Sequence, residues 1–126
     1  MSARIRHIGF YVDNVNAAIP FYGALGYEVV YREKEDWSGV FGNIDVLKLK
    51  SKEGDTLEFI ADSKYRPSNH GVHAAFTVTD MEETCLKLRN LGALFFVDSR
   101  ISEDNKVIVG FCKDPYGFKV ELVEEL

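Results

Sequence analysis

The chain has 126 residues, of which 46% are hydrophobic, and both values are typical of one globular domain with a buried core. Its net charge of −5 comes from residues spread along the sequence, and the lack of a basic cluster argues against a nucleic-acid partner. No apolar run approaches the roughly 18 residues that a membrane span needs, and no apolar segment of a secretion signal follows the first residues. We therefore expect a single domain over residues 1–126, located in the cytoplasm and without a membrane partner.

The first half of the chain predicts one βαβββ module over about residues 4–62. A strand over 5–12 leads into a helix around 16–25, and Pro20 in this helix predicts a short first turn or a kink, because proline lacks a backbone donor. Three extended stretches and a hairpin turn follow, the strands at 27–32, 40–50 and 56–61 and the turn at 51–55. Residues 62–69 are typical of a linker.

The second half repeats this module over about residues 70–124. Five residue pairs recur at one spacing of 66 residues, namely His7/His73, Phe10/Phe76, Val12/Val78, Leu25/Leu91 and Gly26/Gly92. Such self-similarity indicates a duplicated supersecondary unit. The corresponding strands are expected at 71–78, 93–98, 106–113 and 118–123. The sequence therefore predicts an α+β fold of two tandem βαβββ modules.

Local signals define the second helix most clearly. Two overlapping capping boxes precede it, Thr79 with Glu82 or Asp80 with Glu83. Gly92 is suited to end the helix, because glycine adopts positive φ without steric cost. The core-facing stripe of this helix comprises Met81, Cys85 and Leu88.

The two cysteines, Cys85 and Cys112, both fall at apolar positions of predicted elements. We therefore expect buried thiols and no disulfide. Asp114-Pro115-Tyr116-Gly117 predicts a type I turn before the last strand, with each residue at its preferred position.

A histidine on the first strand and a glutamate on the last strand stand at matching places in the two modules. They are His7 and Glu58 in the first module and His73 and Glu121 in the second. Successive side chains of a strand point to opposite faces, and the neighbours of these four residues form apolar faces suited to pack on the helices. We therefore expect all four side chains on one concave face, away from the helices.

Any one of these residues, taken alone, is more typical of a structural or solvent-exposed position. The repeat favours a metal site instead, because a carboxylate within an apolar strand is costly unless it is paired or binds a cation. Two imidazoles and two carboxylates suit a divalent Zn, Ni, Co, Mn or Fe ion and leave two positions open on a six-coordinate ion. Open positions indicate catalysis rather than a structural role.

These stretches resemble the vicinal oxygen chelate superfamily, which includes glyoxalase I, bleomycin-resistance proteins and extradiol dioxygenases. The resemblance covers nearly the whole chain and rests on residues 7–12, 21–26, 73–78 and 114–122. It implies that the two modules form an incomplete eight-stranded barrel around a metal ion, and that the protein is a homodimer.

The ligand set looks most like that of glyoxalase I. This resemblance implies a metal-dependent lyase, isomerase or epimerase that acts on a small oxygenated molecule, such as an α-hydroxycarbonyl compound or an acyl thioester. Glu121 would remove a proton from the carbon next to a carbonyl, Glu58 would share or return that proton, and the metal would stabilise the resulting enediolate.

Two positions depart from glyoxalase I enzymes of similar length. Tyr11 stands where those enzymes have an arginine, and Asp62 stands where they have an asparagine. Both changes remove groups suited to a glutathione anion, which argues against lactoylglutathione formation.

Aromatic residues are the candidates for a substrate wall. Tyr11 shares the face of His7, and Trp37 in an expected polar loop over 35–39 could cover a pocket or pack in a dimer. Phe111 is the third substrate candidate. Weaker candidates are Phe41, Lys48 and Arg100, and His70 is expected to be a loop residue.

Two other functions stay open. An Fe(II) dioxygenase would use His7, His73 and Glu121 alone, and Glu58 counts against it because a fourth ligand would fill a position that oxygen or substrate needs. A metal-free drug-binding protein of the bleomycin-resistance type predicts no ligand set, whereas this chain has a complete one.

Overall fold

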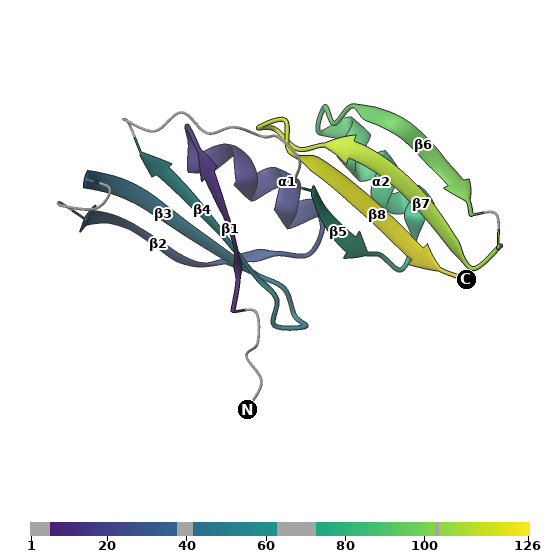
Figure 1. The fold of residues 1–126 in the computed structure, drawn as a ribbon, viewed down its shortest axis with the longest axis horizontal. Helices are drawn as coiled ribbons and strands as arrows, with labels where there is room; N and C mark the ends of the chain where they lie inside the picture. Colours follow the sequence, from purple (N-terminus) through teal and green to yellow (C-terminus); the bar gives the residue numbers. More distant parts are fainter. Residues whose placement is uncertain (1–5, 38–41, 63–72, 103) are drawn as a thin grey trace. The chain divides into compact units, whose positions relative to one another are not determined.

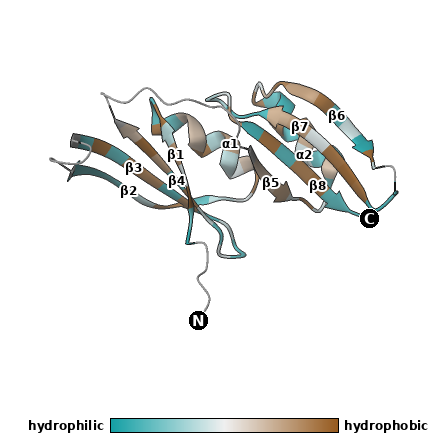
Figure 2. Cartoon of the chain, in the orientation of Figure 1, coloured by the Kyte–Doolittle hydropathy of each residue, from teal (hydrophilic) through white to brown (hydrophobic). Residues whose placement is uncertain are grey.

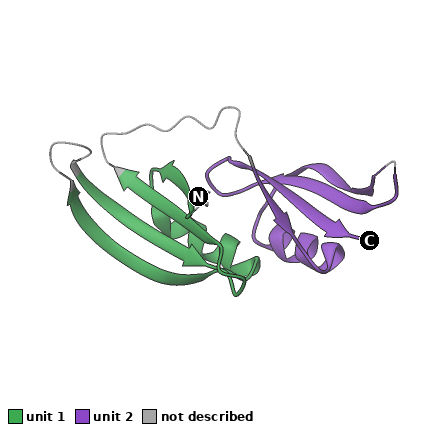
Figure 3. Cartoon of the chain, turned by 60° about the horizontal axis from the view of Figure 1, so that its bottom comes forward, with its two compact units in different colours: residues 1–68 green, residues 69–126 purple. Residues whose placement is uncertain are grey.

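The computed structural model of the chain describes residues 6–37, 42–62, 73–102 and 104–126, with the backbone alone at Trp37, Gly42, Asp62 and His73. The chain divides into two compact units, Met1–Ser68 and Asn69–Leu126 (Figure 3). This boundary falls within the linker expected at 62–69, so each unit holds one predicted module. Whether the two units act as one domain stays a prediction.

The first unit consists of a four-stranded sheet with a helix on one of its faces (Figure 1). Its strands follow the order β1-β4-β3-β2, in which β1 is parallel to β4 and the other pairs are antiparallel. The elements are β1 (Ile8–Val12), the 3-10 helix η1 (Val15–Ala17), α1 (Ala18–Ala24), β2 (Glu28–Trp37), β3 (Gly42–Lys50) and β4 (Thr56–Asp62). This order places β4, which carries Glu58, between β1 and β3.

The second unit has the same architecture. Its strand order is β5-β8-β7-β6, again with the first and last strands of the module parallel. The elements are β5 (His73–Thr77), α2 (Met81–Asn90), β6 (Phe95–Ile101), β7 (Val107–Lys113) and β8 (Lys119–Glu125). The predicted α+β fold of two tandem βαβββ modules is confirmed. The described strands form two separate sheets and no closed barrel.

The core of the first unit lies between the sheet and α1. Phe59 is fully buried and stacks on Phe10 with ring centroids 5.1 Å apart. Its ring also contacts that of Tyr22 in α1, with centroids 5.2 Å apart. Figure 2 shows the alternation of hydrophobic and hydrophilic residues along the strands that produces this one-sided core. Val12 is buried as expected, but Ile8 is 43% exposed. Ile8 begins an edge strand of this sheet, so the apolar face expected beside His7 is buried only at Phe10 and Val12.

The core of the second unit follows the predicted stripe of α2. Met81, Cys85 and Leu88 are buried, and α2 contacts β8. Both cysteines are free and buried, as expected for small apolar residues. In the described parts of the chain, no helix is long and apolar enough to cross a membrane.

Most of the local signals for helix ends are confirmed. Asp80 is the N-cap of α2, where its side chain accepts a hydrogen bond from the Glu83 backbone N–H at 3.0 Å. Gly92 follows the helix with a φ of +90°. In the first unit, α1 has seven residues and Pro20 lies in its first turn, where a backbone N–H would have no helical partner.

The predicted extent of one strand is wrong. The sequence suggested a strand over 27–32 and a polar loop over 35–39, but β2 continues to Trp37, which pairs with Gly42 of β3. Hydrogen bonding within this long hairpin outweighs the polar composition of its tip, because exposed strand residues can be charged. The indole of Trp37 lies outside the described residues.

Candidate functional site

Glu58 lies near the middle of β4, on the face of the sheet that α1 does not cover. Its neighbours Leu57 and Phe59 are buried in the core, so strand alternation turns the carboxylate to the opposite face. The side chain is only 13% exposed. A largely buried carboxylate requires partners, because burial disfavours an isolated charge.

His7 supplies the first partner. It precedes β1 by one residue and shares a face with Gly9, which pairs directly with Glu58 in the parallel ladder. The imidazole Nε2 lies 3.6 Å from Glu58 Oε2, and the His7 side chain is 33% exposed. The imidazole lies near Gly9, where an added Cβ would stand 4.0 Å from His7 Cδ2. The structure thus brings together the histidine and glutamate that the sequence paired in the first module.

Lys48 supplies the second partner. It pairs with Glu58 across the β3–β4 hairpin, and its Nζ lies 3.7 Å from the same oxygen, Oε2. The sequence ranked Lys48 only as a weak substrate candidate. A clear signal for the contact was available, because a turn at 51–55 pairs residue 50 with 56 and therefore 48 with 58.

Tyr31 and Glu35 of β2 extend this group of residues and were missed from sequence. The Lys48 ammonium lies 5.1 Å from the centre of the Tyr31 ring, and the Tyr31 hydroxyl donates a hydrogen bond to Glu35 Oε2 at 2.5 Å. This hydrogen bond is the main reason that the pKa of Tyr31 is raised to about 12. The pairing register of β2 with β3 shifts between Val29 and Tyr31, so turn geometry alone could not have placed this tyrosine beside Lys48.

Glu121 occupies the matching position of the second unit. It lies in β8 between the buried Val120 and Leu122, and it pairs with Ala75 of β5 and Phe111 of β7. Strand alternation again directs this carboxylate away from the helix-covered face. His73 begins β5, two residues before Ala75, and its backbone position is therefore on the face of Glu121. The imidazole of His73 lies outside the described residues.

The expected substrate residues are only partly placed. Tyr11 is half-buried and shares the face of Gly9 in β1. Phe111 is half-buried beside Glu121 and its ring contacts that of Phe96, with centroids 5.8 Å apart. Arg100 is exposed in β6. Phe41 and His70 lie outside the described residues.

The geometry of the first unit suits one metal ion. Two donor atoms bound at about 2.0–2.2 Å to a single ion and separated by roughly 90–110° lie about 2.8–3.6 Å apart. The distance between His7 Nε2 and Glu58 Oε2 is at the upper end of this range. The described side chains contain no group of three or more His, Cys, Asp or Glu residues placed to hold a metal ion. The expected set of four joins both units and includes His73.

A sequence model of the Glyoxalase/Bleomycin resistance protein/Dioxygenase superfamily matches residues 4–122. The chain belongs to this superfamily. This membership confirms the resemblance that the motifs indicated.

Three similar proteins of this superfamily share low sequence identity with the chain. The probable lactoylglutathione lyase of Synechocystis sp. is 28% identical over 122 residues, which cover 94% of this chain and 92% of the relative. A glyoxalase family protein from Bacillus cereus has a TM-score of 0.88 at 19% identity, with coverage of 100% of this chain and 96% of the other. The trypanothione-dependent glyoxalase I of Leishmania major has a TM-score of 0.74 at 23% identity, with coverage of 98% and 88%. At these identities, the two structures establish the fold alone.

Proposed function

We propose that this superfamily member is a divalent-metal-dependent lyase, isomerase or epimerase of the glyoxalase type, with His7, Glu58, His73 and Glu121 as metal ligands. The observation that carries the proposal is the 3.6 Å approach of His7 Nε2 to Glu58 Oε2 on the open face of the first sheet. The matching backbone positions of His73 and Glu121 supply the same pair of residue types in the second unit. The ion would be Zn, Ni, Co, Mn or Fe.

In this proposal the two glutamates move the proton. A bound divalent ion would hold two substrate oxygens and stabilise the negative charge that develops on them. Glu121 would remove the proton from the carbon next to a carbonyl, and Glu58 would share or return it. The buried residues beside each glutamate, Leu57 and Phe59 in one unit, limit access of water from the helix side.

The proposed substrate is a small α-hydroxycarbonyl compound or an acyl thioester. The Synechocystis relative is named a probable lactoylglutathione lyase, which supports proton transfer next to a carbonyl. Tyr11 and Asp62 replace groups suited to glutathione, so we propose a substrate without a glutathione part. Tyr11, Trp37 and Phe111 would contribute to its binding. The proposal also includes a cytoplasmic homodimer, which the family resemblance suggests.

Metal analysis tests the proposal directly. The purified protein would be incubated with Zn, Ni, Co, Mn or, without oxygen, Fe(II), then separated from free metal and analysed for bound ions. We expect one ion per chain, and loss of the ion from Glu58→Ala and His73→Ala. Glu53→Ala, an exposed substitution in the turn before β4, is the matched control and should retain it. A wild-type protein that retains none of these ions would refute the proposal and favour a metal-free binding protein.

Solvent deuterium exchange tests the chemistry. The metal-loaded protein would be incubated in D₂O with small hydroxyketones and acyl thioesters, and deuterium at the carbon next to the carbonyl would be measured. We expect exchange that requires Glu121 and survives in Glu53→Ala. Failure of every compound to exchange would remove the support for proton transfer.

The Lys48 contact favours one second candidate. If Glu58 stays paired with Lys48, the remaining ligands His7, His73 and Glu121 make the two-histidine, one-carboxylate set of Fe(II) dioxygenases. This alternative predicts that Glu58→Ala retains Fe(II) while His73→Ala loses it. Loss of metal from both variants would support the four-ligand site.

A further inference from the structure

Each sheet has a row of four paired residues that crosses all four strands and includes the candidate metal ligand. We define the first carboxylate row as Gly9, Glu58, Lys48 and Tyr31, in the strand order β1-β4-β3-β2. The second carboxylate row is Ala75, Glu121, Phe111 and Val97, in the order β5-β8-β7-β6. The two rows match strand by strand, so differences between them mark what is specific to each unit.

The difference lies on the strand next to the glutamate. In the first carboxylate row this position is Lys48, whose ammonium lies 3.7 Å from Glu58 Oε2. In the second carboxylate row the same position is Phe111, whose ring contacts Phe96. One unit therefore places a fixed positive charge beside its carboxylate, and the other places an aromatic ring there.

The charge balance of the proposed metal site gives this lysine a role. Two carboxylates would neutralise a divalent ion and neutral imidazoles add no charge, so the Lys48 ammonium would remain as a positive charge beside the loaded site, while the Glu35 carboxylate is engaged by the Tyr31 hydroxyl. We propose that Lys48 makes the site selective for an anionic substrate, a small hydroxy or oxo acid whose carboxylate lies beside the metal-binding oxygens. This inference rests on the proposed function and names the substrate class for it.

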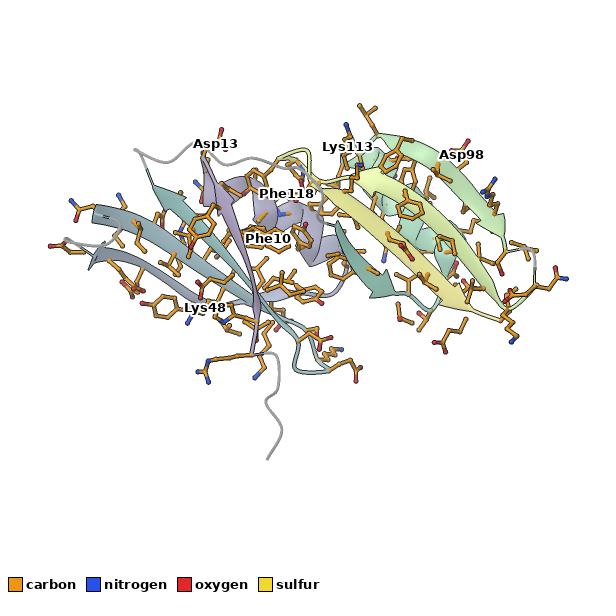
Figure 4. All side chains as sticks on the ribbon, in the orientation of Figure 1. Phe10, Asp13, Lys48, Asp98, Lys113 and Phe118 are labelled. Carbon is orange, nitrogen blue, oxygen red and sulfur yellow. The ribbon has the colours of Figure 1, made fainter. Side chains whose placement is uncertain are left out.

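The surroundings of Lys48 suit such a contact. The residue lies between the buried Leu47 and Leu49, which fix its stem on the open face of β3 (Figure 4). The Tyr31 ring contacts the ammonium from the other side, and the side chain is 35% exposed. The 3.7 Å contact with Glu58 is long, and a metal ion that neutralises Glu58 would weaken it further, so Lys48 could then contact a substrate carboxylate.

A pair of chelating probes tests the inference by binding alone. Acetohydroxamate and malonomonohydroxamate bind a metal through the same two oxygens, but only the second carries an additional carboxylate. Their affinities for the zinc-loaded protein would be measured by calorimetry for the wild type, Lys48→Met and Lys48→Arg. Lys50→Met, which removes a charge from an exposed residue of the same strand, is the matched control.

We expect the wild type, Lys48→Arg and Lys50→Met to bind the carboxylated probe about tenfold or more tightly than acetohydroxamate, as is typical of a hydrogen bond between charged groups. Lys48→Met should lose this preference while it retains one zinc ion and its affinity for acetohydroxamate. An unchanged preference in zinc-loaded Lys48→Met would refute the role of Lys48 and leave the proposed function standing. A wild-type protein without bound metal would refute both.

Discussion

Lys48 and Glu58 are directly paired across the β3–β4 hairpin, with Lys48 Nζ 3.7 Å from Glu58 Oε2. The same oxygen lies 3.6 Å from His7 Nε2. A metal ion bound by His7 and Glu58 would therefore compete with Lys48 for one carboxylate oxygen. This competition would reduce the affinity of the proposed site for metal.

We predict that Lys48→Met raises metal affinity. The substitution removes a positive charge beside the proposed ion. We therefore expect the dissociation constant of the metal to fall about threefold to tenfold, or roughly 0.6–1.4 kcal/mol in binding free energy. Competition with a chromophoric chelator would measure the constant. Lys50→Met should change it by much less, and equal effects of the two variants would show that only overall charge matters.

Tyr31 should stay protonated well above the ordinary tyrosine range. Its pKa is raised from 10.0 to about 12, mainly because the hydroxyl donates a hydrogen bond to Glu35. The stabilisation from this hydrogen bond is complete below about pH 10 and is lost as the pH rises through about 12. NMR of ¹³Cζ-labelled tyrosine, assigned with Tyr31→Phe, should show Tyr31 mostly neutral at about pH 11. A Tyr31 titration midpoint near 10 would contradict the hydrogen bond.

Both thiols should be unreactive in the folded protein. Burial raises the pKa of Cys85, and burial together with the nearby Cys85 raises the pKa of Cys112 to about 12. The thiolate is the reactive form, and both residues are shielded from solvent. Ellman's reagent at about pH 8 should therefore modify neither residue until guanidinium unfolds the chain, and then both. Rapid modification of the folded protein would show that one cysteine is accessible.

Phe59→Ala should strongly destabilise the first unit. The ring is fully buried and contacts Phe10 and Tyr22, so its removal leaves a cavity in the core. The expected loss is about 3–5 kcal/mol in the free energy of unfolding, measured with urea. Val30→Ala removes apolar atoms from a residue of β2 that is 56% exposed, and it should cost less than about 1 kcal/mol. Similar losses for both variants would contradict the assigned core.

Short-range chemistry made much of this fold predictable from sequence. Asp80 and Gly92 mark the ends of α2 through their own backbone and side-chain preferences. The sequence placed Gly92 correctly and gave Asp80 as one of two possible caps. The turn at Asp114 is another such signal, since its carbonyl accepts the Gly117 N–H at 3.0 Å. The repeat itself revealed the two modules, because duplicated strands keep the same alternation.

The structural features that the sequence did not predict depend on how the strands pair. The extension of β2 to Trp37 arises from its hydrogen bonds with β3, and a polar segment gives no sign of them. The contact between Tyr31 and Lys48 requires a register that shifts within β2. The open face of the first sheet was predicted from alternation, whereas the partner of Glu58 on that face required the register as well.

The difference between the first and second carboxylate rows also affects the stereochemistry expected of the proposed reaction. A site built from two identical modules would accept a substrate in either of two orientations related by its internal twofold symmetry, and would present both faces of a planar intermediate to equivalent bases. Lys48 in one module and Phe111 in the other make the two carboxylate rows different. In the proposed enzyme this difference would favour one substrate orientation, with removal of the proton from one face of the carbon, and would let a duplicated fold distinguish mirror-image substrates.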